Sequence, residues 1–541
     1  MSYPPDDRRG LSLRALSSRE YLFLAATILF WAGFVVYLGK DTSWDFRNYH
    51  WYIPYAFLND RMAIDVVVAH QASYYNPFLD IPFYWLATHF PAWFALACLG
   101  AVQGANVVPL YLIARCALRI EDYKLGAGAL ALLGQTGGLS LSLMGLHYYD
   151  NVMSVFVLGG VAILVCNDRT MREGSLVKTA LFAAGAGFLV GIAPGLKLPE
   201  APFAVGFAAA LVALGGDWKH QGTRLAAGAL GGIAGFALCA GYWMLKMEHL
   251  TGNPLFPYFN QYFHSTLAMA RNYRDLRFVP THFWREVFYP ILFAQDWSVA
   301  DDLPYRDIRA ALAYVSVIAA AVLWLFGRRS KEPLMAPRAT LVLFVFTAVS
   351  YIVWLRLFAI YRYIILIEML SPILVAAAVG LMPLPRRAQL VTLGACFFAA
   401  MALTRPDFLD RAPVDDPYVD VALPKFEHPK HTMVLMTGNS PMGFIVPEMP
   451  PEIPVLRIDG WMLHPNDDTG LTRAMRRRVK AFKGDLFLIA ESFDMTRAHD
   501  ALADYDLLID WPKCTLFDTN IIGAYQLCPL LPKPPWMTIK R

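Results

Sequence analysis

The chain has 541 residues, of which 57% are hydrophobic and 17% are charged, and its mean hydropathy is +0.40. A soluble domain carries roughly a quarter of charged residues, so this composition excludes an ordinary soluble protein. The net charge of +4 is too small to indicate a nucleic-acid partner, and what matters is where the basic residues lie.

Along the chain, apolar residues gather in blocks of about 20, the length needed to cross a bilayer. The blocks cover 21–39, 91–114, 125–145, 152–166, 177–193, 201–215, 225–245, 308–326, 339–354, 364–383 and 389–403. They predict a mainly α-helical, polytopic membrane protein with about eleven transmembrane helices and with membrane lipids as its surroundings.

Lysine and arginine are concentrated in alternate connections between these blocks. One set of connections carries Arg115, Arg119, Lys124, Arg169, Arg172, Lys178, Lys219, Arg224, Arg328, Arg329, Lys331, Arg338, Arg386 and Arg387. The short connections of the other set carry only Lys197, Arg356 and Arg362. Because basic residues are enriched in cytoplasmic loops, we expect a cytoplasmic N-terminus. Three large segments, 40–90, 246–307 and 404–541, then lie on the outer face.

The last segment, 404–541, has the pattern of a small α/β domain that follows a membrane module over 1–403. Strand-like runs cover 432–437, 455–458, 485–490, 506–509 and 524–527, with helical stretches near 470–482 and 495–503. The first run ends in Thr437-Gly438-Asn439-Ser440, which is either a phosphate-binding turn or a plain turn. A single glycine favours the plain turn.

Two of the seven cysteines, Cys514 and Cys528, flank a predicted hairpin of this domain, and an oxidising compartment would allow them to pair. The other five lie in or at the ends of apolar blocks, where we expect small buried hydrophobic side chains. These five are Cys98, Cys116, Cys166, Cys239 and Cys396.

The first outer segment, 40–90, mixes acidic, imidazole, amide and aromatic side chains. The candidate site residues within it are Asp45, Arg47, Asn48, Tyr49, His50, His70, Tyr75, Asn76 and Asp80. Aromatic faces next to fixed hydrogen-bonding groups suit a sugar, whose C–H faces stack while its hydroxyls need polar partners. An interfacial aromatic belt is the alternative, but it explains Trp51, Tyr52 and Trp85 and not the acids and imidazoles.

Three short outer connections add ionisable and polar groups on the same predicted face. They contribute His147, Tyr148 and Asp150, then Lys197 and Glu200, then Arg356, Tyr361 and Arg362. Ionisable groups at membrane depth are costly, and they usually line a cavity or pair with each other. The alternatives are a Lys197–Glu200 salt bridge and arginines that extend to the lipid headgroups. For segment 246–307 we expect amphipathic helices at the membrane surface.

This layout resembles the GT-C superfamily of polytopic glycosyltransferases, which use polyprenyl-phosphate-linked sugars. The resemblance covers most of the chain as architecture: many helices, a long first outer loop and a soluble outer C-terminal domain. The family typically carries an essential acid just beyond the first helix, and Asp45 in Trp44-Asp45-Phe46-Arg47 occupies that place. The stretch Tyr75-Asn76-Pro77-Phe78-Leu79-Asp80 also looks like loop sequence of bacterial members. The chain departs from metal-dependent members because 147–151 supplies only Asp150, so the sequence does not indicate a divalent metal.

The resemblance implies an enzyme of the bacterial inner membrane with a periplasmic C-terminal domain. It would move a sugar from a polyprenyl-phosphate donor to a lipid-linked or cell-envelope glycan acceptor. Asp45 would act as general base, with Asp80 or Asp150 as the alternative. Lys197, Arg356 and Arg362 would offset the charge that grows on the leaving phosphate. The histidines, tyrosines and remaining polar residues named above would bind the sugar.

Two other functions fit parts of the sequence. A transporter or flippase of a lipid-linked saccharide predicts polar groups deep within the helices, where only Gln103, Asn106, Gln135 and Glu368 occur. Hydrogen bonds between helices explain Gln103 and Asn106 without any transport path. An assembly or scaffolding protein, whose tail recruits a partner, needs no polar cluster on one face. The one-sided placement of polar residues therefore favours an enzyme.

Overall fold

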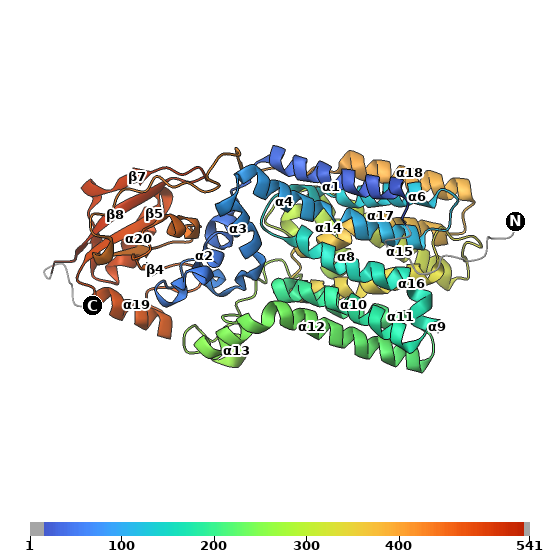
Figure 1. The fold of residues 1–541 in the computed structure, drawn as a ribbon, viewed down its shortest axis with the longest axis horizontal. Helices are drawn as coiled ribbons and strands as arrows, with labels where there is room; N and C mark the ends of the chain where they lie inside the picture. Colours follow the sequence, from blue (N-terminus) through green and yellow to red (C-terminus); the bar gives the residue numbers. More distant parts are fainter. Residues whose placement is uncertain (1–15, 535–541) are drawn as a thin grey trace.

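The computed structural model describes residues 16–534, and it consists of a helical bundle with a sheet-containing domain at one end (Figure 1). We call this end of the bundle the sheet end. Each predicted apolar block is helical. The helices of the bundle are α1 (Ser18–Leu38), α4 (Ala92–Gly104), α5 (Val107–Ala117), α6 (Tyr123–Gln135), α7 (Gly138–Ser142), α8 (Asp150–Cys166), α10 (Leu176–Leu196), α11 (Ala201–Ala213), α12 (Trp218–Thr251), α15 (Arg309–Leu325), α16 (Pro337–Leu357), α17 (Ile365–Leu381) and α18 (Arg386–Leu403).

Six helical spans in the described chain are long and apolar enough to cross a membrane, counting α4 with α5 as one span. The other five are α1, α10, α12, α16 and the span Tyr361–Leu381. Three shorter apolar helices accompany them, namely α8, α15 and the span Leu198–Ala213. By length and composition, this set of helices is compatible with a multi-pass membrane protein.

The third predicted block is interrupted, because α6 ends at Gln135 and α7 begins at Gly138. A Cβ atom on Gly137 would lie 1.9 Å from Oε1 of Glu368, so only glycine leaves room for that carboxylate. The seventh block is longer than predicted, since α12 runs for 34 residues and extends to Thr251.

The predicted outer segments contain short helices. The first contains α2 (Tyr52–Leu58) and α3 (Ile81–His89), and the second contains α13 (Asn260–Phe263) and α14 (Phe283–Gln295). Helix α14 is amphipathic: Tyr289 and Phe293 are buried, whereas Phe283 and Trp284 are exposed. This agrees with the amphipathic helix predicted for 246–307.

The C-terminal domain is built on a mixed sheet. Its elements are β3 (Thr432–Met436), β4 (Val455–Arg457), α19 (Gly470–Ala481), β5 (Asp485–Glu491), α20 (Met495–Ala503), β6 (Leu507–Ile509), β7 (Thr515–Phe517) and β8 (Tyr525–Pro532). The strand order is β4-β3-β5-β8-β6, and β7 also pairs with β8. Strand β3 is parallel to both β4 and β5, whereas β8 is antiparallel to its neighbours.

All five predicted strands and both helices of the tail are present. Strand β7 was not predicted, and β8 continues five residues beyond the predicted end at Leu527. The prolines at 529 and 532 made a strand there unexpected, because proline removes a ladder hydrogen bond.

The tail and the first outer loop are joined by backbone pairing. Strand β1 (Lys40–Asp41) pairs with β2 (Arg411–Ala412), and Val66 forms a parallel bridge with Leu456. The buried Arg61 donates to the carbonyl of Ile453 at 2.6 Å and forms an ion pair with Asp65. The first outer loop therefore packs against the C-terminal sheet domain.

Two disulfide bonds are present among the described residues. Cys514 pairs with Cys528 in the C-terminal domain. Cys116 pairs with Cys166, at the adjacent ends of α5 and α8. The interpretation of Cys116 and Cys166 as small buried hydrophobic side chains was wrong, because the sequence does not reveal that these two helix ends meet.

Candidate functional site

Asp45 follows α1 at the sheet end of the bundle. The Tyr49 hydroxyl donates to its Oδ2 at 3.1 Å, and Nη2 of Arg362 lies 3.9 Å from the same oxygen. The Asp45 side chain retains 16% of its exposure. It is thus an acid held by a hydroxyl, facing a cation and still accessible to solvent.

Arg362 lies between aromatic rings. Its guanidinium carbon is 4.9 Å from the ring centre of Tyr148 and 5.3 Å from that of Tyr363. Within residues 16–534, its buried Nε has no hydrogen-bond partner. The guanidinium therefore keeps donors available for an anion, and its planar shape suits two oxygens of one phosphate.

Asp301 fixes the backbone at this position. The N–H of Arg362 donates to Asp301 Oδ2 at 2.8 Å. Burial raises the pKa of Asp301 to about 6, although the Arg362 charge and N–H act in the opposite direction. The sequence interpretation missed Asp301 because nothing in its local pattern links it to residue 362.

Lys197 lies close to the same rings. Its Nζ donates to the carbonyl of Tyr148 at 2.7 Å and forms an ion pair with Asp150. It also lies 5.2 Å from the ring centre of Tyr363, so two cations flank one ring. Lys197 therefore pairs with Asp150 and not with Glu200, the partner of the alternative salt bridge. The buried Glu200 has no hydrogen-bond partner for its Oε1 in the described chain.

Two tyrosines extend this group toward the outer loops. The hydroxyls of Tyr75 and Tyr258 hydrogen-bond to each other, and their rings stack at 5.8 Å. Tyr49 meets Tyr75 edge to face at 5.5 Å. Tyr258 and Tyr363 were not predicted, although both lie in outer segments rich in aromatic residues.

Segments that are far apart in the sequence thus meet at one place. We call the group formed by Asp45, Tyr49, Tyr148, Asp150, Lys197 and Arg362 the Asp45 cluster. It contains two cations, two carboxylates and two aromatic rings at the ends of apolar helices. Such a group is suited to hold an anionic headgroup and to accept a proton beside it.

Two predicted histidines lie in buried acid–imidazole pairs next to this cluster. Nδ1 of His50 lies 2.6 Å from Asp80 Oδ1, and both side chains are buried. Nδ1 of His147 lies 2.9 Å from Oδ2 of Asp41, an acid that was not predicted. Burial would raise the pKa of Asp41, but hydrogen bonds from His147 and Ser43 hold it below its usual value. Both pairs fix the loop, so Asp80 is a weaker candidate for the base than Asp45.

Other predicted residues of the first loop join it to its neighbours. Asn76 donates to the carbonyls of Gly195 and Cys239, at 3.1 and 2.9 Å, and so fastens the loop to α10 and α12. Asn48 donates to the carbonyl of Ala69 at 3.3 Å. The side-chain amides of Asn48 and Asn76 thus hold the backbone of the first outer loop in place.

Arg47 and His70 face the C-terminal domain. Nη1 of Arg47 donates to the carbonyl of Ile522 at 3.0 Å. Nδ1 of His70 accepts from the N–H of Trp461 at 3.3 Å.

Two predicted residues of the third outer connection also lie outside the Asp45 cluster. Arg356 has a side chain that is 65% exposed, and it pairs with Glu286 at 2.7 Å. Tyr361 is fully buried, and its hydroxyl donates to Glu368 Oε2 at 2.9 Å. Of the two arginines at 356 and 362, only Arg362 contacts the cluster.

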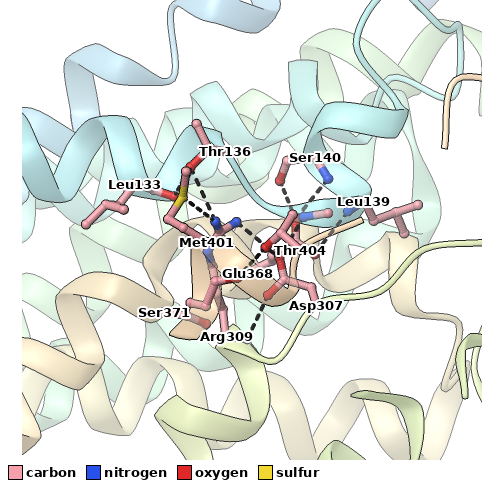
Figure 2. Close-up of polar contacts among 12 residues, drawn as sticks. Leu133, Thr136, Leu139, Ser140, Asp307, Arg309, Glu368, Ser371, Met401 and Thr404 are labelled. Atoms are coloured by element: carbon pink, nitrogen blue, oxygen red, sulfur yellow. Dashed lines mark hydrogen bonds and ion pairs between the residues drawn. The ribbon is translucent and has the colours of Figure 1, made fainter. Parts of the chain in front are cut away.

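A second polar group, which we call the buried network, surrounds Glu368 (Figure 2). It comprises Ser140, Asp307, Arg309, Tyr361, Glu368 and Thr404. Oε1 of Glu368 accepts from the N–H and hydroxyl of Ser140, at 2.8 and 2.7 Å. Oδ2 of Asp307 accepts from the N–H of Gly138 at 2.7 Å and from Nη1 of Arg309 at 3.0 Å. The two carboxylates thus bind the first N–H groups of α7 and join it to α15 and α17.

Comparison with protein-family models, with curated proteins and with solved structures found no match for this chain. Among residues 16–534, no group of three His, Cys, Asp or Glu side chains is arranged to hold a metal ion.

Proposed function

We propose that this protein is a membrane glycosyltransferase. It moves a sugar from a polyprenyl-phosphate-linked donor to a lipid-linked or cell-envelope glycan acceptor, on the side of the membrane that carries the C-terminal domain. The observation that carries this proposal is the partly exposed Asp45 carboxylate beside the Arg362 guanidinium, 3.9 Å apart. A sugar transfer from a phosphate needs a base for the acceptor and a cation for the leaving group.

Arg362 is the proposed phosphate ligand. Its Nε is unpartnered in the described part of the chain, and its planar fork can bind two phosphate oxygens at once. Lys197 is already paired with Asp150, so it contributes less net charge at this place. The rings of Tyr148 and Tyr363 exclude water from the arginine and strengthen its interaction with an anion.

Asp45 is the proposed general base. Its carboxylate takes the proton of an acceptor hydroxyl while the hydroxyl oxygen forms a bond to the anomeric carbon. The bond from that carbon to the phosphate oxygen breaks, and the phosphate leaves with the electron pair. Arg362 then offsets the negative charge on the leaving phosphate. The hydroxyl of Tyr49 orients Asp45 in the free enzyme.

The architecture that we propose is that of the GT-C superfamily, with eleven membrane crossings and a cytoplasmic N-terminus. It would lie in a bacterial inner membrane with its sheet in the periplasm. The helices found at every predicted apolar block support this proposal. The location of the first loop and the sheet at one end of the bundle also supports it (Figure 1).

A flippase of lipid-linked saccharide is the alternative. The amides of Gln103 and Asn106 hydrogen-bond to backbone carbonyls, at 3.3 Å to Leu146 and at 2.6 Å to Asn151 respectively. These contacts match the packing role expected for such amides in helical bundles. They therefore give a transport path no support.

The experiment is sugar transfer from a panel of radiolabelled polyprenyl-phosphate sugars in proteoliposomes. We expect Asp45→Asn to lower turnover about 100-fold or more, the usual contribution of a general base. The matched control is Asp60→Asn, an exposed acid of the same loop, which should keep full turnover. Full turnover in Asp45→Asn would refute the base. Movement of lipid-linked saccharide without any turnover would favour the flippase.

A further inference from the structure

The C-terminal sheet has a topological switch point. Strand β3 lies in the middle of the parallel strands, and its connection leads to β4 on one side. The chain then crosses through α19 to β5, on the other side of β3. In open α/β sheets, ligands bind at the carboxyl ends of the strands where the connections diverge in this way. A ligand of this sheet is therefore expected at the loops after β3 and β5.

These two loops contact each other and retain unused polar atoms. The hydroxyl of Ser440, after β3, donates to Asp494 Oδ2, after β5, at 2.6 Å. The buried Oγ1 of Thr437 and Oδ1 of Asn439 have no hydrogen-bond partner in the part of the chain that the structure describes. Buried polar atoms are nearly always paired, so each such atom needs an explanation, and a ligand at this edge would supply one.

The first outer loop places an aromatic stack on this edge. The Trp44 ring stacks on His70 at 6.1 Å and on Trp461 at 5.5 Å. Trp461 follows β4, and Arg271 holds it by donating to its carbonyl at 3.2 Å. Trp461 nevertheless remains 48% exposed. The Trp461 ring thus stacks on the first outer loop, its backbone is held by Arg271, and its face remains open to solvent.

The charges at this edge disfavour a phosphate. Asp459 is paired with Arg497 at 2.6 Å, and Glu491 lies 3.9 Å from Arg47. Asp494 is hydrogen-bonded only to a hydroxyl among the contacts described. Burial keeps the pKa of His70 well below its usual value, and the nearby Arg457 adds to this effect. His70 is therefore neutral, and the edge offers acceptors and rings in place of excess positive charge.

We propose that this edge is a saccharide-binding surface, formed by Trp44, His70, Asn439, Trp461 and Asp494. The sugar's C–H face stacks on Trp461, and its hydroxyls pair with the acid and amide oxygens. Trp44 directly precedes Asp45 in the first outer loop, so this loop contributes to both the surface and the proposed base. If the protein is a glycosyltransferase, the bound saccharide is the acceptor, and this last step rests on the proposed function.

Binding is tested without any donor, by calorimetry on the full-length protein in lipid nanodiscs. The probes are soluble oligosaccharides: maltohexaose, cellohexaose, mannohexaose and chitohexaose, with FMN and UMP as phosphate-bearing comparisons. We expect binding of at least one oligosaccharide, and a tenfold or greater loss in Trp461→Ala. Trp461→Phe keeps a ring and should lose less. The matched control is Trp511→Ala, because Trp511 lies in the same domain and is 50% exposed. The Trp511→Ala protein should bind the oligosaccharide as tightly as the unmodified protein does.

The outcomes separate this surface from the proposed transfer reaction. Trp461→Ala should lower the affinity for the oligosaccharide, and Asp45→Asn should lower turnover with every donor that the unmodified protein uses. The proposed surface would be overturned if no oligosaccharide bound. Equal losses of affinity in Trp461→Ala and Trp511→Ala would also overturn it, as would binding of FMN or UMP alone. Absence of turnover with every donor would refute the transfer reaction and leave the binding result standing.

Discussion

At the scale of single residues, the identity of the cation beside Asp45 is the central feature. Arg362 is positioned by aromatic rings and by its own backbone N–H, and within residues 16–534 its buried Nε has no hydrogen-bond partner. A lysine would carry the same charge, but it is a compact point charge without the planar fork. The proposed phosphate contact thus depends on the shape of the side chain as well as on its charge.

We expect Arg362→Lys to reduce turnover about tenfold to a hundredfold, because one of two parallel hydrogen bonds to the phosphate is lost, roughly 1.5–3 kcal/mol. The matched control is Arg356→Lys, an exposed arginine near the same helix end. Its turnover should stay within twofold of the unmodified protein. Steady-state kinetics with the preferred polyprenyl-phosphate sugar measure both variants. Equal effects at 356 and 362 would show that no specific phosphate contact is made.

The sequence could identify rare ionisable groups, but not their partners. Lys197 and Arg362 were predicted because cations are scarce in the short outer connections, and Asp45 because of its position just beyond the first helix. Their contacts depend on the orientation of each helix end, and this is why Arg356 and Arg362 looked equivalent in the sequence. Asp41 and Asp301 were missed for the same reason, since their partners lie far away in the chain.

At the scale of elements, the break between α6 and α7 is built around two carboxylates. A helix that begins inside a bundle exposes N–H groups that need acceptors. Glu368 supplies acceptors to Ser140, and Asp307 supplies one to Gly138. Glu368 also accepts from Tyr361, the residue before Arg362, so the network supports the backbone of the Asp45 cluster.

We expect Glu368→Gln to destabilise the protein by about 1–3 kcal/mol, because the new NH₂ group cannot accept from a buried donor. Thermal unfolding in detergent measures this change as a lower Tm. The matched control is Glu286→Gln, which removes an exposed ion pair with Arg356 and should cost about 0–1 kcal/mol. An unchanged Tm in Glu368→Gln would mean that the network does not support α7.

Regular elements were predictable from the sequence and short irregular ones were not. The tail strands and α19 were found because alternation and helical periodicity extend over whole segments. Strands β1 and β2 contain two residues each, too few to form a pattern, and only their pairing defines them. The break at Gly137 depends on a carboxylate from α17, which no local window contains.

At the scale of the whole molecule, the first loop and the C-terminal domain act as one cap on the bundle. The ion pair of Arg61 and Asp65 is buried between them, and Arg457 donates to the carbonyl of Val68 at 2.8 Å. This cap carries the proposed saccharide surface at the edge of its sheet and Asp45 in its first loop. The two sites therefore face the same side of the membrane, whichever side that is.

The two disulfides provide a test of orientation. Helix α8 runs from Asp150 in the Asp45 cluster to Cys166, and at 1.5 Å per residue this separation is roughly 25 Å. The Cys116–Cys166 pair is therefore at the end of α8 remote from the sheet, whereas Cys514–Cys528 is within the sheet domain. A reducing cytoplasm and an oxidising periplasm cannot favour both bonds equally.

With the proposed orientation, we expect Cys514 and Cys528 to remain paired in cells, while Cys116 and Cys166 are largely reduced. Cells are denatured in excess maleimide and the labelled cysteines are identified by peptide mass spectrometry. Cys98, Cys239 and Cys396, which are free in the structure, give the reference for full labelling. The opposite pattern, with labelled Cys514 and Cys528 and a protected Cys116–Cys166 bond, would place the sheet in the cytoplasm. The donor headgroup would then have to be cytoplasmic, and transfer on the periplasmic face would be refuted.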